Sequence, residues 1–264
     1  VHVSVVREKL LVTGGAGLFA SRILGRIQGQ YELVLADLKG KHGTPIIPLD
    51  ILDYDAVERA LLGVDMVLHL AIATARELSH LGDEEYADET MRVNVMGTQH
   101  VLEAAAANSG VKRVVLCSSA MATIGWPRAR GYNPDPPYRT ADLYGLSKLV
   151  VEQLGDLYAR TRQLPVACRR GGEPWPRGEE ATDQQKLSNT FWRALMVHWD
   201  DLAQAIDCAL AAKQVLFSIT NVVSNSDASD CVPSENSIGY HPTWCCSEGG
   251  ASSSTPAGTV LRRR

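Results

Sequence analysis

A tyrosine and a lysine stand four residues apart in Tyr144-Gly145-Leu146-Ser147-Lys148, within a stretch of helical periodicity. Residues four apart share one face of a helix. A lysine ammonium in that position favours the phenolate and lowers the pKa of a neighbouring tyrosine. A tyrosine tuned in this way can exchange a proton with an alcohol or a carbonyl near neutral pH. The pair therefore predicts acid–base chemistry.

Two serines, Ser118 and Ser119, end the apolar stretch 111–119, which predicts a buried strand. Open α/β sheets bind their ligands at the carboxyl ends of the strands. A serine hydroxyl at that edge can hold the oxygen of the reacting group while the tyrosine moves the proton.

A glycine-rich turn lies near the start of the chain, in KLLVTGGAGLFA at 9–20. The apolar run 9–13 predicts a strand, Gly14 to Gly17 a tight turn, and the residues from Leu18 a helix. This order places a pyrophosphate at a helix N-terminus. Asp37 ends the next predicted strand, 20 residues beyond Gly17, where a carboxylate accepts hydrogen bonds from the adenosine ribose. Its charge repels a 2′-phosphate, so we expect NAD rather than NADP.

Strands and helices alternate along the chain, which predicts an α/β fold: a Rossmann-type, doubly wound parallel sheet with a small C-terminal substrate lobe. We expect strands at 9–13, 31–37, 44–50, 64–71, 111–119, 164–170 and 215–223, and helices from 18, from Asp53 to Gly63, and at 86–108, 141–159 and 199–213. The segments 120–143 and 171–190 are expected to be irregular. We divide the chain into an NAD-binding domain (1–165), a substrate lobe (166–223) and an irregular tail (224–264).

The overall composition limits the classes of function. The 264 residues carry a net charge of −4, whereas proteins that bind nucleic acids usually have a basic face. We expect neither nucleic acid nor membrane as a partner, because no apolar run is long enough to cross a bilayer. The six cysteines show no zinc-binding spacing, so we expect no metal. With no signal-peptide pattern in view, a reduced cytoplasmic protein is the expectation.

Taken together, these motifs resemble the extended short-chain dehydrogenase/reductases of the NAD-dependent epimerase/dehydratase type, over about residues 8–210. The matching pieces are TGGAGLFA, Asp37, Asp50-Ile51, HLA at 69–71, VNVMGT around Asn94, the serine pair, YGLSK and VHWDDLAQA.

The resemblance implies a role for each matched position. Tyr144 would be the acid/base, Lys148 would tune it and bind the nicotinamide ribose, and Ser119 would be the catalytic serine, since 25 residues separate it from Tyr144. Ser118 stays a possible alternative, and Thr123 a third. Asn94 is expected beside the cofactor in a structural or water-organising role. The other cofactor-binding residues would be Gly14, Gly17, Leu18, Phe19, Asp37, Asp50, Ile51, Leu70 and Ala71, with Ala20 in place of the third glycine of the turn.

Within that family the chain looks most like the compact uronate dehydrogenase branch, through YGLSK, WDDLAQAIDCALAA, ITNVVSNS and IGYHP. The branch implies hydride transfer between NAD and a hydroxyl or carbonyl group of a sugar or sugar acid. A small substrate fits, because only about 75 residues separate Lys148 from the polar tail. Two alternatives stay open: a sugar epimerase or dehydratase without net redox change, and a non-catalytic NAD-binding sensor or scaffold. The resemblance also implies a homodimer formed through the helices at 86–108 and 141–159.

The chain departs from that branch after the sixth predicted strand, where it reads Arg169-Arg170-Gly171-Gly172 instead of Arg-Ile-Gly and a polar residue. We therefore expect Arg170 to bring a charge to a usually apolar position facing the substrate, and Gly172 to lack a substrate-binding side chain. No single arginine matches a substrate-carboxylate ligand. The candidates are Arg128, Arg130, Arg139 and Arg193.

Overall fold

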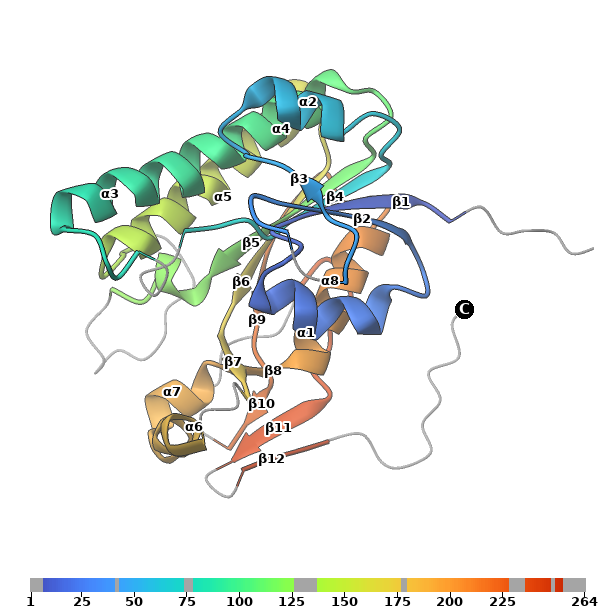
Figure 1. Cartoon of the computed structure of the whole chain (residues 1–264). Coiled ribbons are helices and arrows are strands. Elements are labelled where there is room, and N and C mark those ends of the chain that lie inside the picture. Colours follow the sequence, from blue (N-terminus) through green and yellow to red (C-terminus); the bar gives the residue numbers. More distant parts are fainter. Residues whose placement is uncertain are drawn as a thin grey trace, which may run out of the picture.

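A seven-stranded sheet, parallel at every pairing, is the centre of the computed structural model (Figure 1), which describes residues 7–40, 43–73, 78–125, 137–176, 180–227, 236–247 and 250–253. The strand order is β3-β2-β1-β4-β5-β6-β9. The strands are β1 (Lys9–Thr13), β2 (Glu32–Asp37), β3 (Ile47–Pro48), β4 (Met66–His69), β5 (Arg113–Ser119), β6 (Val166–Gly171) and β9 (Phe217–Val222). This order confirms the predicted doubly wound α/β fold, whose direction of winding reverses between β1 and β4.

Helices cover both faces of the sheet, so the strands are buried on both sides. On one face lie α1 (Leu18–Ile27) and α8 (Trp199–Ala211). On the other lie α2 (Tyr54–Ala60), α4 (Thr98–Ala107) and α5 (Leu143–Arg162), with α3 (Asp83–Met91) beside α5 (Figure 1). Each face has its own apolar cluster, and neighbouring residues of a strand therefore enter different clusters.

The third strand is shorter than the predicted 44–50, because only Ile47 and Pro48 pair with β2. Pro45 and Pro48 lack the N–H that a strand interior needs, which confines this segment to the edge of the sheet.

The helix predicted at 86–108 is not regular. A π-helical turn (Arg92–Gly97) joins α3 to α4. Asn94, in this turn, is buried, and its side chain bonds both backbone groups of Ala73: Oδ1 accepts from the N–H at 2.7 Å, and Nδ2 donates to the carbonyl at 3.2 Å. Such turns often mark functional sites.

Beyond the carboxyl edge of β6, β7 (Glu173–Trp175) pairs with β8 (Met196–His198), and α6 (Glu180–Ser188) and α7 (Thr190–Ala194) lie between them in sequence. The expectation of an irregular segment at 171–190 was therefore wrong in part. The strands β6 and β9 and the helix α8, which fall in the predicted substrate lobe (166–223), belong to the main layers around the central sheet. The boundary at 165 stays a prediction.

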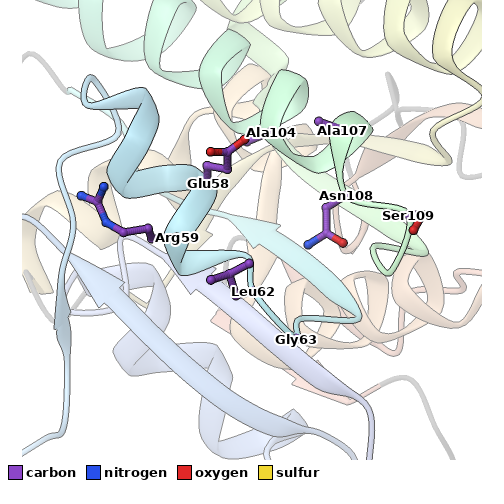
Figure 2. Close-up of a pocket in the computed structure, with 8 residues that line it drawn as sticks. All are labelled: Glu58, Arg59, Leu62, Gly63, Ala104, Ala107, Asn108 and Ser109. Atoms are coloured by element: carbon purple, nitrogen blue, oxygen red, sulfur yellow. The ribbon is translucent and has the colours of Figure 1, made fainter.

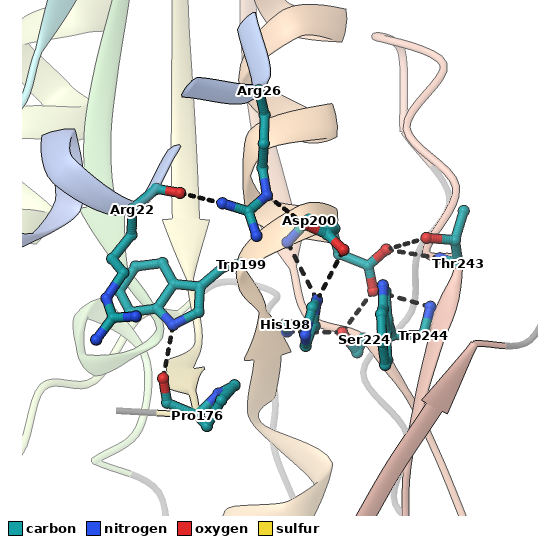
Figure 3. Close-up of polar contacts among 10 residues, drawn as sticks. Arg22, Arg26, Pro176, His198, Trp199, Asp200, Ser224, Thr243 and Trp244 are labelled. Atoms are coloured by element: carbon teal, nitrogen blue, oxygen red, sulfur yellow. Dashed lines mark hydrogen bonds and ion pairs between the residues drawn. The ribbon is translucent and has the colours of Figure 1, made fainter. Parts of the chain in front are cut away.

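The expected irregular tail includes ordered structure within its described residues: β10 (Asn225–Ser226), β11 (Trp244–Ser247) and β12 (Gly250–Ser253). Asp201 at the start of α8 holds this part, since its fully buried carboxylate accepts hydrogen bonds from Ser224 Oγ, Thr243 N and Oγ1, and Trp244 N. Figure 3 shows Thr243 and Trp244 beside His198 and Ser224, and the His198 ring stacks on Trp244 at 3.7 Å. The sequence did not predict these contacts, because the segment is polar and has no apolar periodicity.

No helix in the described ranges is both long enough and apolar enough to span a membrane.

Candidate active site

The glycine-rich turn joins β1 to α1 at the switch between β1 and β4. Gly14 has a φ of +71°, and a Cβ there would stand 2.7 Å from the backbone nitrogen of Ala71, so only glycine fits. Helix α1 begins after Gly17, with no acidic residue in its first turn. Its first N–H groups and its dipole thus favour an anion, and the turn fits the pyrophosphate of NAD.

Asp37, at the end of β2, reaches back to this turn. Its Oδ2 accepts from the backbone N–H of Ala16 at 3.0 Å, and its Oδ1 from that of Lys39 at 3.1 Å. The carboxylate therefore stands where the sequence placed it, beside the glycine turn, and also helps to hold that turn.

The other predicted cofactor residues do not share one environment. Leu70 and Ala71 follow β4, and their N–H groups donate to the Thr13 carbonyl at 3.1 Å and the Thr13 hydroxyl at 3.4 Å, beside Gly14. Ile51 is buried against Gly97, whereas Asp50 is exposed and accepts from Leu52 N.

The first two residues of α1 also differ. Leu18 is exposed, and the Phe19 ring packs edge-on against Trp199 of α8 at 5.5 Å. The Phe19 ring is thus occupied by this contact, and the group of Phe19 that lies at the start of α1 is its backbone N–H. Figure 3 shows how Trp199 is held, with its Nε1 donating to the Pro176 carbonyl at 2.7 Å.

Tyr144 and Lys148 lie in the first two turns of α5, one turn apart as predicted. Lys148 is only 3% exposed, and its Nζ donates to the Cys117 carbonyl at 3.0 Å and stands 5.7 Å from the centre of the Tyr144 ring. Burial lowers the pKa of Lys148 to about 8, against opposing influences of Cys117 and Glu152. The ammonium is therefore charged at neutral pH and close to the tyrosine.

Gly145 brings this turn of α5 against the residues that follow Ser119. A Cβ at Gly145 would collide with the carbonyl of Met121, which lies in the short 3₁₀ helix η2 (Ala120–Ala122). Asp142 begins the helix by accepting a hydrogen bond from Gly145 N at 2.7 Å. Tyr144 is thus set beside the carboxyl end of β5 by a glycine contact and an N-cap.

The three candidate hydroxyl residues have different surroundings. Ser118 is buried, and its Oγ donates to Glu152 Oε1 at 2.5 Å on the α5 face. Ser119, the next residue, is half-buried, and its Oγ accepts from Met121 N at 3.2 Å. Thr123 is buried and its Oγ1 donates to the Ala120 carbonyl at 3.3 Å. Ser119 is therefore the one whose side chain is not buried.

Two buried polar residues to which the sequence analysis assigned no role, His69 and Ser147, lie next to the site. Buried His69 is hydrogen-bonded to Thr13 Oγ1 at 2.7 Å and to Thr98 Oγ1 at 3.0 Å. Burial lowers its pKa to about 3, so its ring is neutral. The Asn94 Nδ2 also donates to Ser147 Oγ at 3.2 Å, which ties the π-helical turn to α5. Only the place of His69 at the end of a strand and that of Ser147 within a helix could have pointed to them.

The expectation that the Arg170 charge would face the substrate was wrong, because the side chain is 2% exposed and paired with the buried carboxylate of Glu152. Arg170 lies on the α5 face, where its Nε and Nη2 donate to the two oxygens of Glu152, each at 2.8 Å. The charge that lies in an apolar environment is that of the neighbouring residue, Arg169, which is 1% exposed and lies on the α8 face of the sheet. Its guanidinium has no hydrogen-bond partner among the described residues, and burial lowers its pKa.

The space beside Gly172 is occupied by a neighbouring segment of the chain. A Cβ there would collide with the carbonyl of Leu195, so the segment before β8 occupies the space of a side chain. Of the candidate arginines, Arg193 is committed elsewhere: Nε donates to Asp227 and Nη1 to the Leu187 carbonyl, each at 2.6 Å. Arg139 is exposed, and Arg128 and Arg130 lie outside the described residues.

A surface pocket lies elsewhere, between the C-terminal ends of α2 and α4 (Figure 2). It includes Gly63, which precedes β4, and Ser109, which precedes β5, so it opens at the amino edge of the sheet, opposite Ser119. Open α/β sheets bind their ligands at the opposite edge, at the carboxyl ends of the strands. Over the described ranges, no three His, Cys, Asp or Glu side chains form a metal-binding group.

Known proteins are similar to this chain in sequence and in fold. The uronate dehydrogenase of Pseudomonas putida is 28% identical over 211 residues, covering 77% of this chain and 71% of its own. The L-arabinose 1-dehydrogenase (NAD(P)(+)) of Haloferax volcanii is 27% identical over 252 residues, 89% of this chain and 96% of its own. The crystal structure of uronate dehydrogenase from Agrobacterium tumefaciens superposes with a TM-score of 0.75 at 25% identity, covering 91% of this chain and 86% of that one.

The sequence profile of the NAD dependent epimerase/dehydratase family matches residues 10–195, which hold the glycine turn, Asp37, Ser119, Tyr144 and Lys148. The chain therefore belongs to the NAD-dependent epimerase/dehydratase family of extended short-chain dehydrogenase/reductases.

Proposed function

We propose that the protein is an NAD-dependent oxidoreductase that transfers a hydride between NAD and a hydroxyl or carbonyl group of a sugar or sugar acid. The observation that carries the proposal is the buried, charged Lys148 beside Tyr144, with Ser119 next to them at the same sheet edge as the glycine turn. This set can move a proton next to a bound dinucleotide.

In the direction of oxidation, the phenolate of Tyr144 removes the proton from the substrate hydroxyl while the carbon–oxygen bond becomes a carbonyl. NAD supplies the acceptor for the hydride that leaves the same carbon. Ser119 Oγ holds the reacting oxygen, and the Lys148 ammonium stabilises the phenolate. In the opposite direction Tyr144 returns the proton.

For the cofactor, we assign the pyrophosphate to the turn Gly14–Gly17 and the start of α1 at Leu18 and Phe19. Asp37 binds the adenosine ribose. Asp50 and Ile51 flank the adenine, and Leu70, Ala71 and Asn94 line the path towards the nicotinamide. Lys148 and Tyr144 stand at the nicotinamide ribose. The fit of the turn and the position of Asp37 beside it support this set.

A small sugar acid or free sugar is the substrate class we favour, because uronate dehydrogenase and L-arabinose 1-dehydrogenase are among the relatives. The segments beyond the carboxyl edge of the sheet also pack closely against it, as the Leu195 carbonyl does against Gly172, which favours a small substrate. Arg139 is the described candidate for a substrate carboxylate, alongside Arg128 and Arg130.

A second candidate function is that of an epimerase or dehydratase, which would recycle its NAD within one turnover. The family includes such enzymes, and a putative UDP-glucose 4-epimerase is 30% identical over 184 residues. A third is NAD binding without catalysis, against which the Ser119, Tyr144 and Lys148 set argues.

One experiment separates these functions. Purified protein is mixed with NAD and a panel of uronic acids, aldoses and sugar phosphates, and the absorbance of reduced cofactor is followed, with sugar products analysed in parallel. Net NADH formation with a uronic acid or aldose supports the proposal. An altered sugar without NADH supports the epimerase or dehydratase, and NAD binding without any product supports the sensor.

We also propose a homodimer built through the helices at 86–108 and 141–159. Leu146 and Leu157 of α5 are exposed and, being eleven residues apart, share one face of the helix, and Met96 is exposed nearby on the π-helical turn. The cytoplasm is the proposed location, since the five described cysteines are free thiols.

A further inference from the structure

A buried polar network joins four segments behind the candidate active site. Glu152 of α5 is completely buried and binds Arg170 of β6 through both carboxylate oxygens. Its Oε1 also accepts from Ser118 of β5. On the other side, the Arg170 guanidinium stands 4.7 Å from the centre of the Tyr138 ring, in the segment that leads into α5. Bidentate pairing and stacking both favour a fixed guanidinium plane.

This network is built on the same elements as the reaction. Glu152 lies one turn beyond Lys148 and two turns beyond Tyr144 on α5. Ser118 precedes Ser119, and Arg170 is the direct partner of Ser118 in the pairing of β5 with β6. A shift of the guanidinium would therefore displace the helix that carries Tyr144 and the strand that carries Ser119.

We infer that Arg170 is a positioning residue for hydride transfer, which through Glu152, Ser118 and Tyr138 holds α5 in register with the end of β5 and balances the carboxylate next to Lys148. The inference rests on the proposed function of this site.

Several charged or titratable groups surround Lys148 and Glu152. Those facing them are Tyr144 on α5, Cys117 on β5, Cys168 and Arg170 on β6, Tyr138 before α5, and the neutral His69 on β4. Among the described residues, the other nearby cations are Arg170, which binds Glu152, and Arg169, whose charge acts on Cys117 and Cys168. Glu152 acts directly on Lys148, and Arg170 is the bidentate partner of that carboxylate.

The inference is tested by two substitutions that are expected to shift the pH profile of kcat/KM in opposite directions. Arg170→Met leaves the Glu152 carboxylate unbalanced, which favours the ammonium of Lys148 and disfavours a phenolate. The alkaline fall of kcat/KM then moves up by about one pH unit. Glu152→Gln removes the negative charge that favours the ammonium of Lys148, so the fall moves down. Both variants lose about tenfold or more in kcat with little change in KM, because the reacting groups are displaced, and the double variant returns the pH profile towards that of the wild type.

Matched controls are Arg160→Met and Asp156→Asn, which break an exposed ion pair on the same helix. They are expected to leave kcat and the pH profile unchanged. If Arg170→Met is not recovered folded, Arg170→Lys and the double variant carry the test. Shifts of the same sign in both single variants, or no shift with unchanged kcat, would overturn the inference.

A readout without substrate keeps the inference separate from the proposed function. The tyrosinate absorbance that disappears in Tyr144→Phe is titrated in the wild type and in each variant. It is expected at higher pH in Arg170→Met and at lower pH in Glu152→Gln. Opposite shifts with no sugar oxidised would overturn the proposed function alone, whereas equal titrations beside normal oxidation would overturn the role of Arg170.

Discussion

Lys148 shows how burial adapts an ordinary side chain to a chemical task. It is charged below pH 8, where it can support a phenolate, and it is held by a backbone carbonyl rather than by a carboxylate in direct contact. A salt bridge in that position would neutralise its effect on Tyr144. The site therefore depends on one ammonium that has lost most of its water.

The lowered pKa of Lys148 predicts an alkaline fall in activity. As the pH rises through about 8, the ammonium loses its proton and no longer stabilises the phenolate, so kcat/KM for oxidation falls. Lys148→Arg keeps its charge at that pH, because an arginine pKa lies above about 12, and the fall moves to higher pH. The measurement is kcat/KM against pH for both proteins, and equal alkaline limbs would contradict this role.

Individual residues also show what the sequence could and could not predict. The Tyr144 and Lys148 pair, the glycine turn and Asp37 were readable, because each depends on local spacing. Which of Arg169 and Arg170 is paired was not, since it depends on which strand face meets α5. For the same reason the sequence left Ser118 and Ser119 open, and the structure distinguishes them by the contact of Ser118 with Glu152 and by the partial exposure of Ser119.

Among the elements, α5 depends most on close approach. Gly145 lets its first turn contact Met121, and a Cβ at Gly155 would stand 3.0 Å from Cys168 Sγ. Because both glycines face neighbours, the helix lies nearer to β5 and β6 than larger residues would allow. This closeness brings Tyr144 to the strand end.

Replacing Gly145 with alanine is therefore expected to lower kcat/KM about tenfold or more, because the added Cβ must push the Tyr144 turn away from Met121. The matched control is Gly25→Ala in α1, where a Cβ meets nothing within 4 Å. It should raise the free energy of unfolding by about 0.5–1 kcal/mol and leave activity unchanged. Steady-state kinetics and chemical denaturation check both, and full activity in Gly145→Ala would refute the close-approach argument.

In β6, Arg169 has no hydrogen-bond partner within the described part of the chain, which predicts a gain in stability when it is replaced. Arg169→Leu places an apolar side chain in the cluster between the sheet and α8, and should raise the free energy of unfolding by about 1–4 kcal/mol. Arg113→Leu is the contrast, because buried Arg113 donates to the carbonyls of Ala212 and Val215 and its loss should destabilise. Urea denaturation measures both changes, and a destabilised Arg169→Leu would show that this charge has a partner in solution.

Element prediction succeeded where the apolar pattern was strong, as in β1, β4, β5 and α8. It failed where polar contacts create the order. The π-helical turn depends on Asn94 reaching Ala73, and the strands after Ser224 depend on Asp201, so neither leaves a hydrophobic period to read.

For the whole molecule, the sheet order brings segments that are far apart in the sequence to one edge. The glycine turn, Asp37 and Ala71 come from the first four strands and the turns that follow them, and Ser119 and Tyr144 follow later in the chain. Their meeting at the switch between β1 and β4 follows from the topology alone, which is why the fold could be predicted before the substrate.

The proposed dimer rests on exposed apolar residues of α5 and of the π-helical turn. Leu157→Glu puts a charge into the exposed stripe of α5 and is expected to convert a dimer to a monomer at micromolar concentration. Leu62→Glu, at an exposed apolar site after α2, should leave the assembly unchanged. Light scattering after gel filtration reports the mass, and a wild type that is already monomeric would contradict the proposal.

The role of Tyr144 is tested most directly by comparing NADH formation by the wild type and by Tyr144→Phe on the sugar-acid and aldose panel. The wild type is expected to reduce NAD with at least one member, and Tyr144→Phe is expected to lose about a hundredfold or more in kcat while still binding NAD. A Tyr144→Phe protein that kept most of its turnover would contradict the central claim that Tyr144 moves the substrate proton.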